Sequence, residues 1–150
     1  MRSDTERKAM HGADPRTRLG APAYTPTART AIYDRIIHRA RNILKTGHSV
    51  LIDATFLDPD DRERATNITA GTGIALHRFW LEAPPDILID RVTARRGDAS
   101  DADADVVRAQ VANTAPPHDW TIIAAAGSVA DTARRIGLVS REAGAIPVAD

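Results

Sequence analysis

The fold of this chain is decided by the stretch Ser49-Val50-Leu51-Ile52-Asp53-Ala54-Thr55-Phe56. Its apolar run does not alternate with polar residues, which predicts a short strand over residues 49–54, buried on both faces of a parallel sheet. Gly47 stands where a preceding helix would end, and Asp58-Pro59 is a typical start for the next helix. The stretch is therefore expected to be a strand between two helices.

Asp53 ends the predicted strand. In α/β folds the groups at the carboxyl ends of parallel strands face the ligand crevice. A carboxylate there can hold a cation such as Mg²⁺, directly or through water. The alternative is that Asp53 only caps the turn into the next helix, and the local pattern leaves both interpretations open.

The composition is that of an ordinary globular domain. The 150 residues are 43% hydrophobic and 27% charged, and Lys+Arg and Asp+Glu balance at 20 each. This balance argues against binding to nucleic acid or to an anionic membrane. The chain has no cysteine, which excludes a disulfide framework and thiolate metal sites. The polar N-terminus does not resemble a signal peptide and no apolar run is long enough for a membrane span, so we expect a cytoplasmic protein.

Several helices are predicted from caps and periodicity. Ser3 followed by Glu6 is typical of a capping box, and on the helix that it starts Asp4 and Arg7 share one face, where they could simply form a surface ion pair. Residues 11–27 are rich in Gly and Pro and are expected to form a loop, with Pro26 as an alternative start of the helix that follows. Apolar residues at helical spacing then predict a scaffold helix from Ala28 to Thr46, with its buried stripe at Ile32, Ile36, Ile37, Ala40, Ile43 and Leu44.

The second half alternates helices with strands. A helix over 59–70 and a strand over 75–81 are followed by a helix after Pro85, a polar loop at 97–103 and a helix capped by Ser100 with Asp103. A third strand is expected at 120–124, and a last helix after Gly127-Ser128. This order predicts an α/β domain with a parallel sheet over residues 1–140, and residues 141–150 are expected to be a flexible tail.

Arg91, Arg95 and Arg96 form a basic cluster beside the polar loop. Arginines three to five residues apart on a helix can converge on phosphate oxygens, because the planar guanidinium matches that anion. Taken alone, the cluster is more typical of a solvated helix face.

Three segments occur together and in order: Ser3-Asp4-Thr5-Glu6-Arg7-Lys8, Val50 to Phe56, and Arg95-Arg96-Gly97-Asp98-Ala99-Ser100-Asp101-Ala102. Over residues 2 to about 125 the sequence resembles the ATP-binding, AAA-like P-loop kinase domain that is often fused to aminoglycoside-phosphotransferase-like domains in bacteria. More distantly it is similar to polynucleotide, gluconate and zeta-toxin-type kinases. The resemblance implies a three-layer, P-loop NTPase-like α/β fold, with Mg²⁺ and ATP as cofactors.

The resemblance also implies roles for individual residues. Asp53 is expected to be the Walker-B-type carboxylate of the Mg²⁺ shell, and Asp4 to orient or deprotonate the acceptor hydroxyl. Arg7 and Thr55 are expected to bind the substrate. Arg91 and Arg95 are expected to be lid arginines that stabilise charge on the transferring phosphoryl group, with Arg96 as the alternative to Arg95. The implied partners are a nucleotide and a small-molecule or nucleotide acceptor.

One part of the family pattern is missing. These kinases hold phosphates with the motif G-x-x-x-x-G-K-[ST], which the 150 residues do not contain. In the family this loop and the first strand would precede residue 1, and that strand would lie between the predicted strands at 49–54 and 75–81. The domain is thus expected to be incomplete at its N-terminus and this isolated chain to be inactive. A misplaced start, a truncated gene remnant and a genuine non-catalytic binding or assembly module, such as a homo-oligomer that closes the gap, remain the three explanations, in that order.

Overall fold

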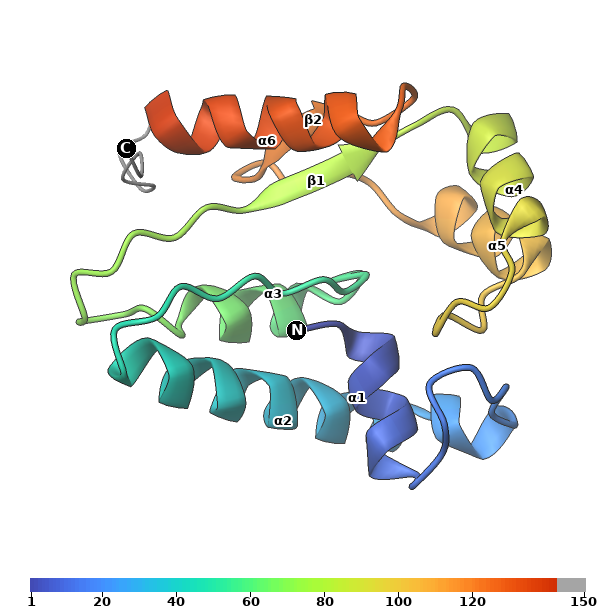
Figure 1. Ribbon diagram of the computed structural model, residues 1–150, viewed down its shortest axis with the longest axis horizontal. Helices are drawn as coiled ribbons and strands as arrows, with labels where there is room; N and C mark the ends of the chain where they lie inside the picture. Colours follow the sequence, from blue (N-terminus) through green and yellow to red (C-terminus); the bar gives the residue numbers. More distant parts are fainter. Residues whose placement is uncertain (143–150) are drawn as a thin grey trace. The chain divides into compact units, whose positions relative to one another are not determined.

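The computed structural model describes residues 1–142 (Figure 1). The chain divides into two compact units. The first unit comprises residues 1–73 and 95–101, and the second comprises residues 74–94 and 102–150. Each of the two units has its own internal packing and is described separately. The tail predicted at 141–150 falls for the most part outside the described residues, although the last helix continues through Glu142.

The first unit is built from helices. It contains α1 (Ser3–Met10), the 3₁₀ turn η1 (Ala21–Tyr24), α2 (Pro26–Lys45) and α3 (Pro59–Thr66). Helix α2 begins with Pro26 at its first position, and the Thr25 side chain caps it by accepting a hydrogen bond from the Ala28 N–H. Helix α3 likewise begins at a proline, with Asp58 as its cap. The predicted helix starts at Ser3, Pro26 and Pro59 are therefore confirmed.

The core of the first unit lies along one face of α2. The predicted stripe is buried at Ile32, Ile36, Ile37 and Ala40, and Tyr33 joins it. Residues 50 and 52 rest against this face, together with Ile68 and part of α3. This packing confirms the prediction that α2 is a scaffold helix, because its periodic apolar face has a matching apolar surface to cover.

The predicted strand at 49–54 is wrong. The segment is not part of a sheet and makes one isolated parallel bridge, between Arg2 and Asp53. Within the described residues its backbone partners are Met1 and Ser3, and Leu51 is 75% exposed instead of buried. A strand needs a ladder of backbone hydrogen bonds to a neighbouring strand. The partner segment, residues 1–3, is too short to form such a ladder. The bridge still fixes where Asp53 lies.

Two predicted caps and one predicted length also differ from the structure. Arg2 occupies the cap position of α1 without a side-chain capping hydrogen bond, and Ser3 is already the first helical residue. The Glu6 side chain pairs with Arg35 and Arg39 on α2. The fifth helix is capped by Asp103 alone. Helix α3 ends at Thr66 and does not extend to residue 70, because turns at residues 67–72 follow it.

The second unit contains the sheet. Its elements are β1 (Phe79–Glu82), α4 (Pro85–Ala94), α5 (Ala104–Asn113), β2 (Thr121–Ala124) and α6 (Val129–Glu142). Strands β1 and β2 run parallel, with Phe79 opposite Thr121 and Glu82 opposite Ala124. Helix α4 contacts α5, and α6 contacts β2. The α/β character and the parallel pairing are as predicted, although within the described residues the sheet has two strands and β1 starts four residues later than expected.

No helix within residues 1–142 combines the length and the apolar character that crossing a lipid bilayer requires.

Candidate active site

The N-terminal residues bring Asp4 close to Asp53. Because the Ser3 N–H donates to the Asp53 carbonyl at 2.9 Å and the Asp53 N–H donates to the Met1 carbonyl at 2.8 Å, the start of α1 is held beside the extended segment that ends in Asp53. The sequence predicted both carboxylates as site residues from separate motifs. The structure puts them in one unit, on either side of a residue that no motif singled out.

That residue is Arg2. Its guanidinium donates two hydrogen bonds to the Asp98 carboxylate, at 2.6 and 3.1 Å. It also lies 3.5 Å from Asp53 Oδ2 and 3.9 Å from Asp4 Oδ2. The fork of an arginine is suited to such a two-point contact with one carboxylate while its outer atoms face others. Arg2 therefore links the three acidic side chains through a single cation.

Asp4 has the electrostatic environment of a proton acceptor. Its side chain is 26% exposed, and burial raises the pKa of its carboxyl, although Arg2 and Arg7 pull that pKa in the opposite direction. Ser100 makes a side-chain hydrogen bond to it. A carboxylate whose pKa is raised by burial binds a proton more readily than a solvated one.

Asp53 differs from Asp4 in being open. Its side chain is 70% exposed, and its Oδ2 lies 3.5 Å from Arg2 Nε. The oxygens of Asp53 thus remain accessible to a ligand from solvent. The carboxylate chemistry fits Mg²⁺, which takes one or two protein carboxylates and completes its shell with water and phosphate oxygens.

Within residues 1–142, no group of three or more His, Cys, Asp or Glu side chains is arranged to hold a metal ion.

Arg7 is more enclosed than its predicted role suggests. Its Nη1 donates to the Ala23 carbonyl at 2.7 Å, and its guanidinium lies 4.6 Å from the centre of the Tyr24 ring. Its Nε is buried without a hydrogen-bond partner. Arg7 thus anchors η1 to α1 with one edge, and leaves one buried donor unsatisfied.

Thr55 lies just beyond Asp53, in the turn that leads toward α3. Its side chain hydrogen-bonds with the Tyr33 hydroxyl, which also accepts from the Phe56 N–H at 3.1 Å. Phe56 has a positive φ of 45°, an uncommon conformation for a non-glycine residue. Tyr33 therefore fixes this turn from the core side, and Thr55 contributes to holding it.

Segment 97–101 is attached to α1 by its polar side chains. Asp98 contacts Arg2 and Ser100 contacts Asp4, while Asp101 is 2.6 Å from Lys8 Nζ. The Lys8 side chain is 1% exposed. These contacts explain the Gly-Asp-Ala-Ser-Asp motif as a set of attachments to α1, a function that its sequence alone did not indicate.

The carboxylate of Asp101 is the centre of a wider network. It accepts hydrogen bonds from the Leu19 N–H at 3.0 Å and from the Tyr24 hydroxyl, and Lys8 also donates to the Thr17 carbonyl. Burial raises the pKa of the Asp101 carboxyl, but the hydrogen bonds from Lys8, Tyr24 and Leu19 outweigh it and hold that pKa below its usual range. Burial, followed by the hydrogen bond to Asp101, raises the pKa of the Tyr24 hydroxyl. The network orders the loop at 11–25 against α1.

The two predicted lid arginines lie in different units. Arg95 is in the first unit, exposed, with Nη1 3.8 Å from Asp98 Oδ1. Arg91 is in the second unit, where its guanidinium donates to the carbonyls of Ala125, Ala126 and Gly127 at 2.6 to 3.0 Å. Arg91 therefore braces the turn after β2. Arg96 donates to the Arg95 carbonyl and is also exposed.

Comparison with known proteins gives the family. A family model described as an AAA domain matches residues 1–117. The chain belongs to this AAA domain family. The match covers α1, the Arg2–Asp53 bridge and segment 95–101, so the AAA domain includes every residue of the site. An AAA domain is associated with a P-loop NTPase-like α/β fold.

Three relatives of this AAA domain carry the name uncharacterized protein. One from Mycobacterium bovis and two from strains of Mycobacterium tuberculosis are each 36% identical over 102 residues, which is 68% of this chain. The chain spans 20% of the length of these relatives. No solved structure matches the chain.

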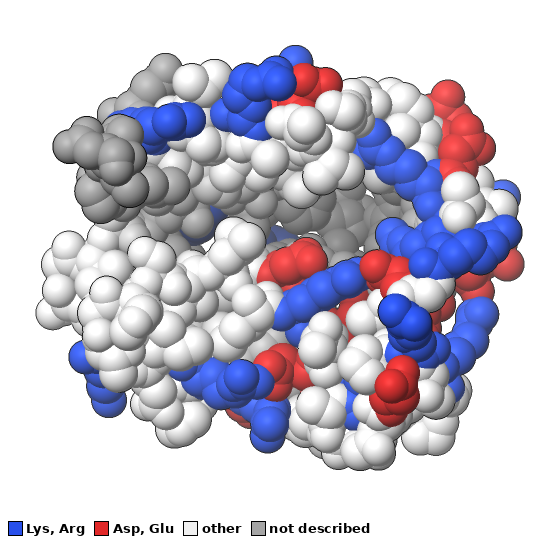
Figure 2. Space-filling model, viewed as in Figure 1, with Lys and Arg blue, Asp and Glu red and all other residues white. Residues whose placement is uncertain are grey.

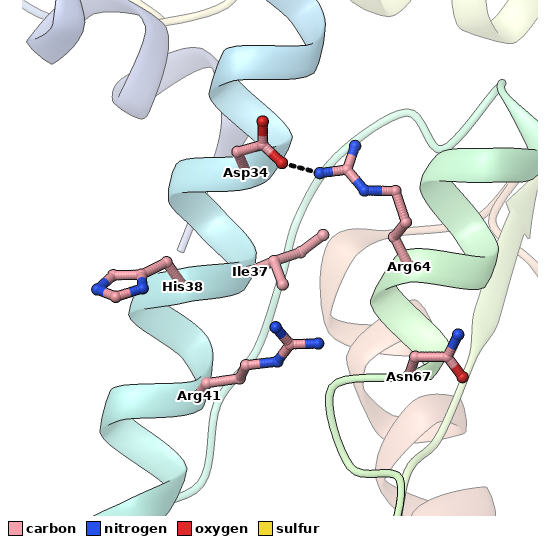
Figure 3. Close-up of a pocket in the computed structure, with 6 residues that line it drawn as sticks. All are labelled: Asp34, Ile37, His38, Arg41, Arg64 and Asn67. Atoms are coloured by element: carbon pink, nitrogen blue, oxygen red, sulfur yellow. Dashed lines mark hydrogen bonds and ion pairs between the residues drawn. The ribbon is translucent and has the colours of Figure 1, made fainter.

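A separate hollow lies between α2 and α3 (Figure 3). Its volume is about 340 Å³, and it is lined by Asp34, Ile37, His38, Arg41, Arg64 and Asn67. Arg64 points across it to an ion pair with Asp34. The hollow shares no residue with the group around Arg2 and is not part of the candidate site.

Charge is distributed in close pairs on the AAA domain. On the face in Figure 2, basic and acidic side chains lie next to one another. This agrees with the balanced composition. Most of the ion pairs in the first unit join residues that are far apart in sequence.

Sequence reasoning found Asp4 and Asp53 through motifs but missed Arg2 and Lys8, because a long-range ion pair leaves no local signal.

Proposed function

We propose that this chain is part of an ATP-dependent phosphotransferase domain, a kinase that acts on a hydroxyl of a small molecule or nucleotide. The observation that supports this most is the meeting of Asp4 and Asp53 at the Arg2 guanidinium, through the bridge between residues 2 and 53. A carboxylate near the acceptor and another near the metal are what phosphoryl transfer requires, because its catalysis rests on positioning and on neutralising oxygen charge.

Asp4 is proposed to receive the proton of the acceptor hydroxyl at its carboxylate oxygen. Its half-buried position and its raised pKa support this role. A positioned general base typically contributes 10²- to 10⁴-fold to a rate, as an order of magnitude. Ser100 would keep the carboxylate oriented through its hydrogen bond.

Asp53 is proposed to hold Mg²⁺ together with the phosphates of ATP, and its exposed carboxylate supports this role. When bound, Mg²⁺ would supply neutralisation of the charge on the phosphate oxygens. Thr55 is proposed to bind substrate from the turn after Asp53.

The arginines are proposed to act on the phosphate oxygens to different degrees. Arg95 is exposed and 3.8 Å from its acidic neighbour, so its guanidinium is available to an anionic ligand. Arg7 offers an unsatisfied buried Nε for the acceptor. Arg91 is the weaker candidate, because three carbonyls already occupy its donors.

The 150 residues do not contain the G-x-x-x-x-G-K-[ST] motif, so we propose that the isolated chain transfers phosphate poorly or not at all. The loss of a single preorganised donor can cost about 10²–10³ in rate. We also propose that the complete domain has a three-layer arrangement, with helices on both faces of a parallel sheet. The alternative is a non-catalytic binding or assembly module, which is supported by the exposure of Leu81 and Ile122 on the two-stranded sheet.

Calorimetric titration of the chain with Mg-ATP tests the proposal. Because the 150 residues do not contain the phosphate-binding motif, we expect weak binding at most, which depends on Mg²⁺, is weaker still in Asp53→Asn and is unchanged in Asp119→Asn, an exposed carboxylate of the second unit that pairs with Arg78. Folding of each variant is checked by circular dichroism. Tight Mg-ATP binding by the unmodified chain would overturn the proposal that the missing motif disables it, and equal binding by Asp53→Asn would overturn the role of Asp53. The absence of Mg-ATP binding by a folded chain that self-associates at the same concentrations would support the assembly module.

A further inference from the structure

The hollow between α2 and α3 lies within the first unit and has no part in the proposed kinase chemistry. On α2, its lining residues Asp34, Ile37 and Arg41 follow one another at intervals of three and four residues, which places them on one face of the helix. Arg64 of α3 faces them from the other side (Figure 3). Each of the two helices therefore contributes one arginine to the same hollow.

Arg41 differs from the other arginines of α2. Arg29 pairs with the residue that caps α3, and Arg35 and Arg39 share the Glu6 carboxylate. Within residues 1–142, by contrast, the Arg41 side chain makes no hydrogen bond or ion pair. Its guanidinium points from α2 into the hollow (Figure 3). The N–H donors of this guanidinium are thus left for solvent or for a ligand.

Arg64 has acidic neighbours, but one of them is held only weakly. Its guanidinium pairs with Asp34, and its Nη1 also lies 3.4 Å from Oδ1 of the buried Asp61. The Asp34 side chain is 62% exposed, so its ion pair with Arg64 is well solvated and contributes little to stability. An anion with a larger charge than one carboxylate can therefore take the place of Asp34 on Arg64.

A phosphate group fits these two arginines better than a carboxylate does. It carries up to two negative charges for two guanidinium groups, and the planar guanidinium matches the spacing of its oxygens. The volume of about 340 Å³ is at the lower end of the range of small-molecule sites. The apolar side chain of Ile37 extends into the space between the two arginines (Figure 3). The hollow thus has room for a small organic group beside the phosphate.

We propose that this hollow binds the phosphate group of a small molecule between Arg41 and Arg64, and that Asp34 occupies Arg64 when no ligand is bound. The inference does not rest on the kinase proposal, because the hollow shares no residue with the site around Asp4 and Asp53. Inorganic phosphate and a phosphate monoester have this chemistry in common, and the experiment distinguishes them.

The experiment is a nuclear magnetic resonance titration that follows the side-chain Nε–H signals of Arg41 and Arg64. Glycerol 2-phosphate and inorganic phosphate are added separately at pH 7, with the ionic strength kept constant by NaCl. We expect saturable shifts of both signals, with a dissociation constant on the order of 1–10 mM. Tighter binding of glycerol 2-phosphate would assign the site to a phosphate monoester, whereas equal binding would assign it to the phosphate group alone.

Two variants of the hollow should change the affinity in opposite directions. We expect Arg41→Gln to weaken binding roughly 5- to 10-fold, because it removes charged donors. Asp34→Asn should strengthen binding roughly 2- to 5-fold, because it removes the competing carboxylate. The matched controls are Arg108→Gln and Asp105→Asn, from an exposed ion pair of the second unit, which change the net charge equally and should leave the affinity unchanged. Circular dichroism checks that each variant is folded.

General attraction of anions to basic side chains would affect each variant of the hollow and its control alike. The inference would be overturned by shifts that do not saturate, by an Arg41→Gln affinity equal to that of Arg108→Gln, or by Asp34→Asn binding no more tightly than Asp105→Asn. The kinase proposal is tested separately, through Mg-ATP binding and Asp53→Asn, so either result can fail while the other stands.

Discussion

The two units of this AAA domain are held together by different interactions. In the first unit, ion pairs join residues that are far apart in sequence, such as Lys8 with Asp101 and Arg35 with Glu6, and several of the partners are buried. In the described part of the second unit, Arg108–Asp105 and Arg134–Asp131 lie one helical turn apart, Arg78–Asp119 joins distant residues, and all three pairs are exposed. The fully buried apolar side chains also lie mainly in the first unit. The proposed catalytic carboxylates thus sit in the unit whose parts are cross-linked by charge.

This difference shows why the site depends on more than its helices. Helix α1 is short, and a helix of its length is marginal by itself in water. Glu6 and Lys8 attach it to α2 and to segment 97–101 from two sides. The position of Asp4 is therefore set by these attachments, which are long-range and polar.

The largest expected effect compares two ion pairs of the same length. Lys8–Asp101 and Arg108–Asp105 both measure 2.6 Å, but the first is buried and the second is exposed. We expect Lys8→Met to lower the free energy of unfolding by about 3–5 kcal/mol, because it leaves the Asp101 charge uncompensated, and Arg108→Met to lower it by less than about 0.5 kcal/mol. Urea denaturation followed by circular dichroism measures both.

The double variant Lys8→Met/Asp101→Leu tests the cause. If the cost comes from an unpaired buried charge, removal of both partners should recover much of the lost stability. Equal effects of Lys8→Met and Arg108→Met would show that burial does not distinguish the two units and would break the comparison.

A smaller effect concerns acid stability. The hydrogen bonds from Arg2 hold the pKa of Asp98 below its ordinary value of 3.8, at about 2. Because this folded pKa is lowered, the charged carboxylate stabilises the fold above about pH 3.8, and that contribution is lost as the pH falls from there through about 2. Allowing for screening of the partly exposed pair, we expect it to be about 1 kcal/mol.

The matched control is Asp131 of the second unit, whose pKa is lowered by Ser128 and Arg134 at the exposed start of α6. Stability of Asp98→Asn should depend less on pH between 4 and 2 than that of the unmodified chain, whereas Asp131→Asn should follow the unmodified curve closely. An Asp98→Asn curve parallel to the unmodified one would mean that the Arg2 contact adds nothing to stability.

What could be predicted from the sequence was local. The buried face of α2 follows from apolar spacing, and the starts at Pro26 and Pro59 follow from proline and cap chemistry, all within a few residues. The Arg2–Asp98 contact joins positions with no common pattern, so no local signal could reveal it. Arg91 illustrates the reverse error. It belongs to a cluster whose spacing is typical of phosphate binding, but its guanidinium donates to backbone carbonyls. The predicted roles of Asp4, Asp53 and Arg95 are untested and stay predictions.

The smallest expected effect concerns residues 49–56, on which the predicted fold was based. A strand buried on both faces would make Leu51→Ala cost about 2–5 kcal/mol, the range for a leucine removed from a core. In the structure Leu51 is 75% exposed, so we expect a change within about 0.5 kcal/mol. Ile36→Ala, at a side chain that is 1% exposed in α2, should show the full core cost under the same denaturation assay. A large loss in Leu51→Ala would mean that this stretch is covered in solution, and the single bridge between Arg2 and Asp53 would then be part of a wider sheet.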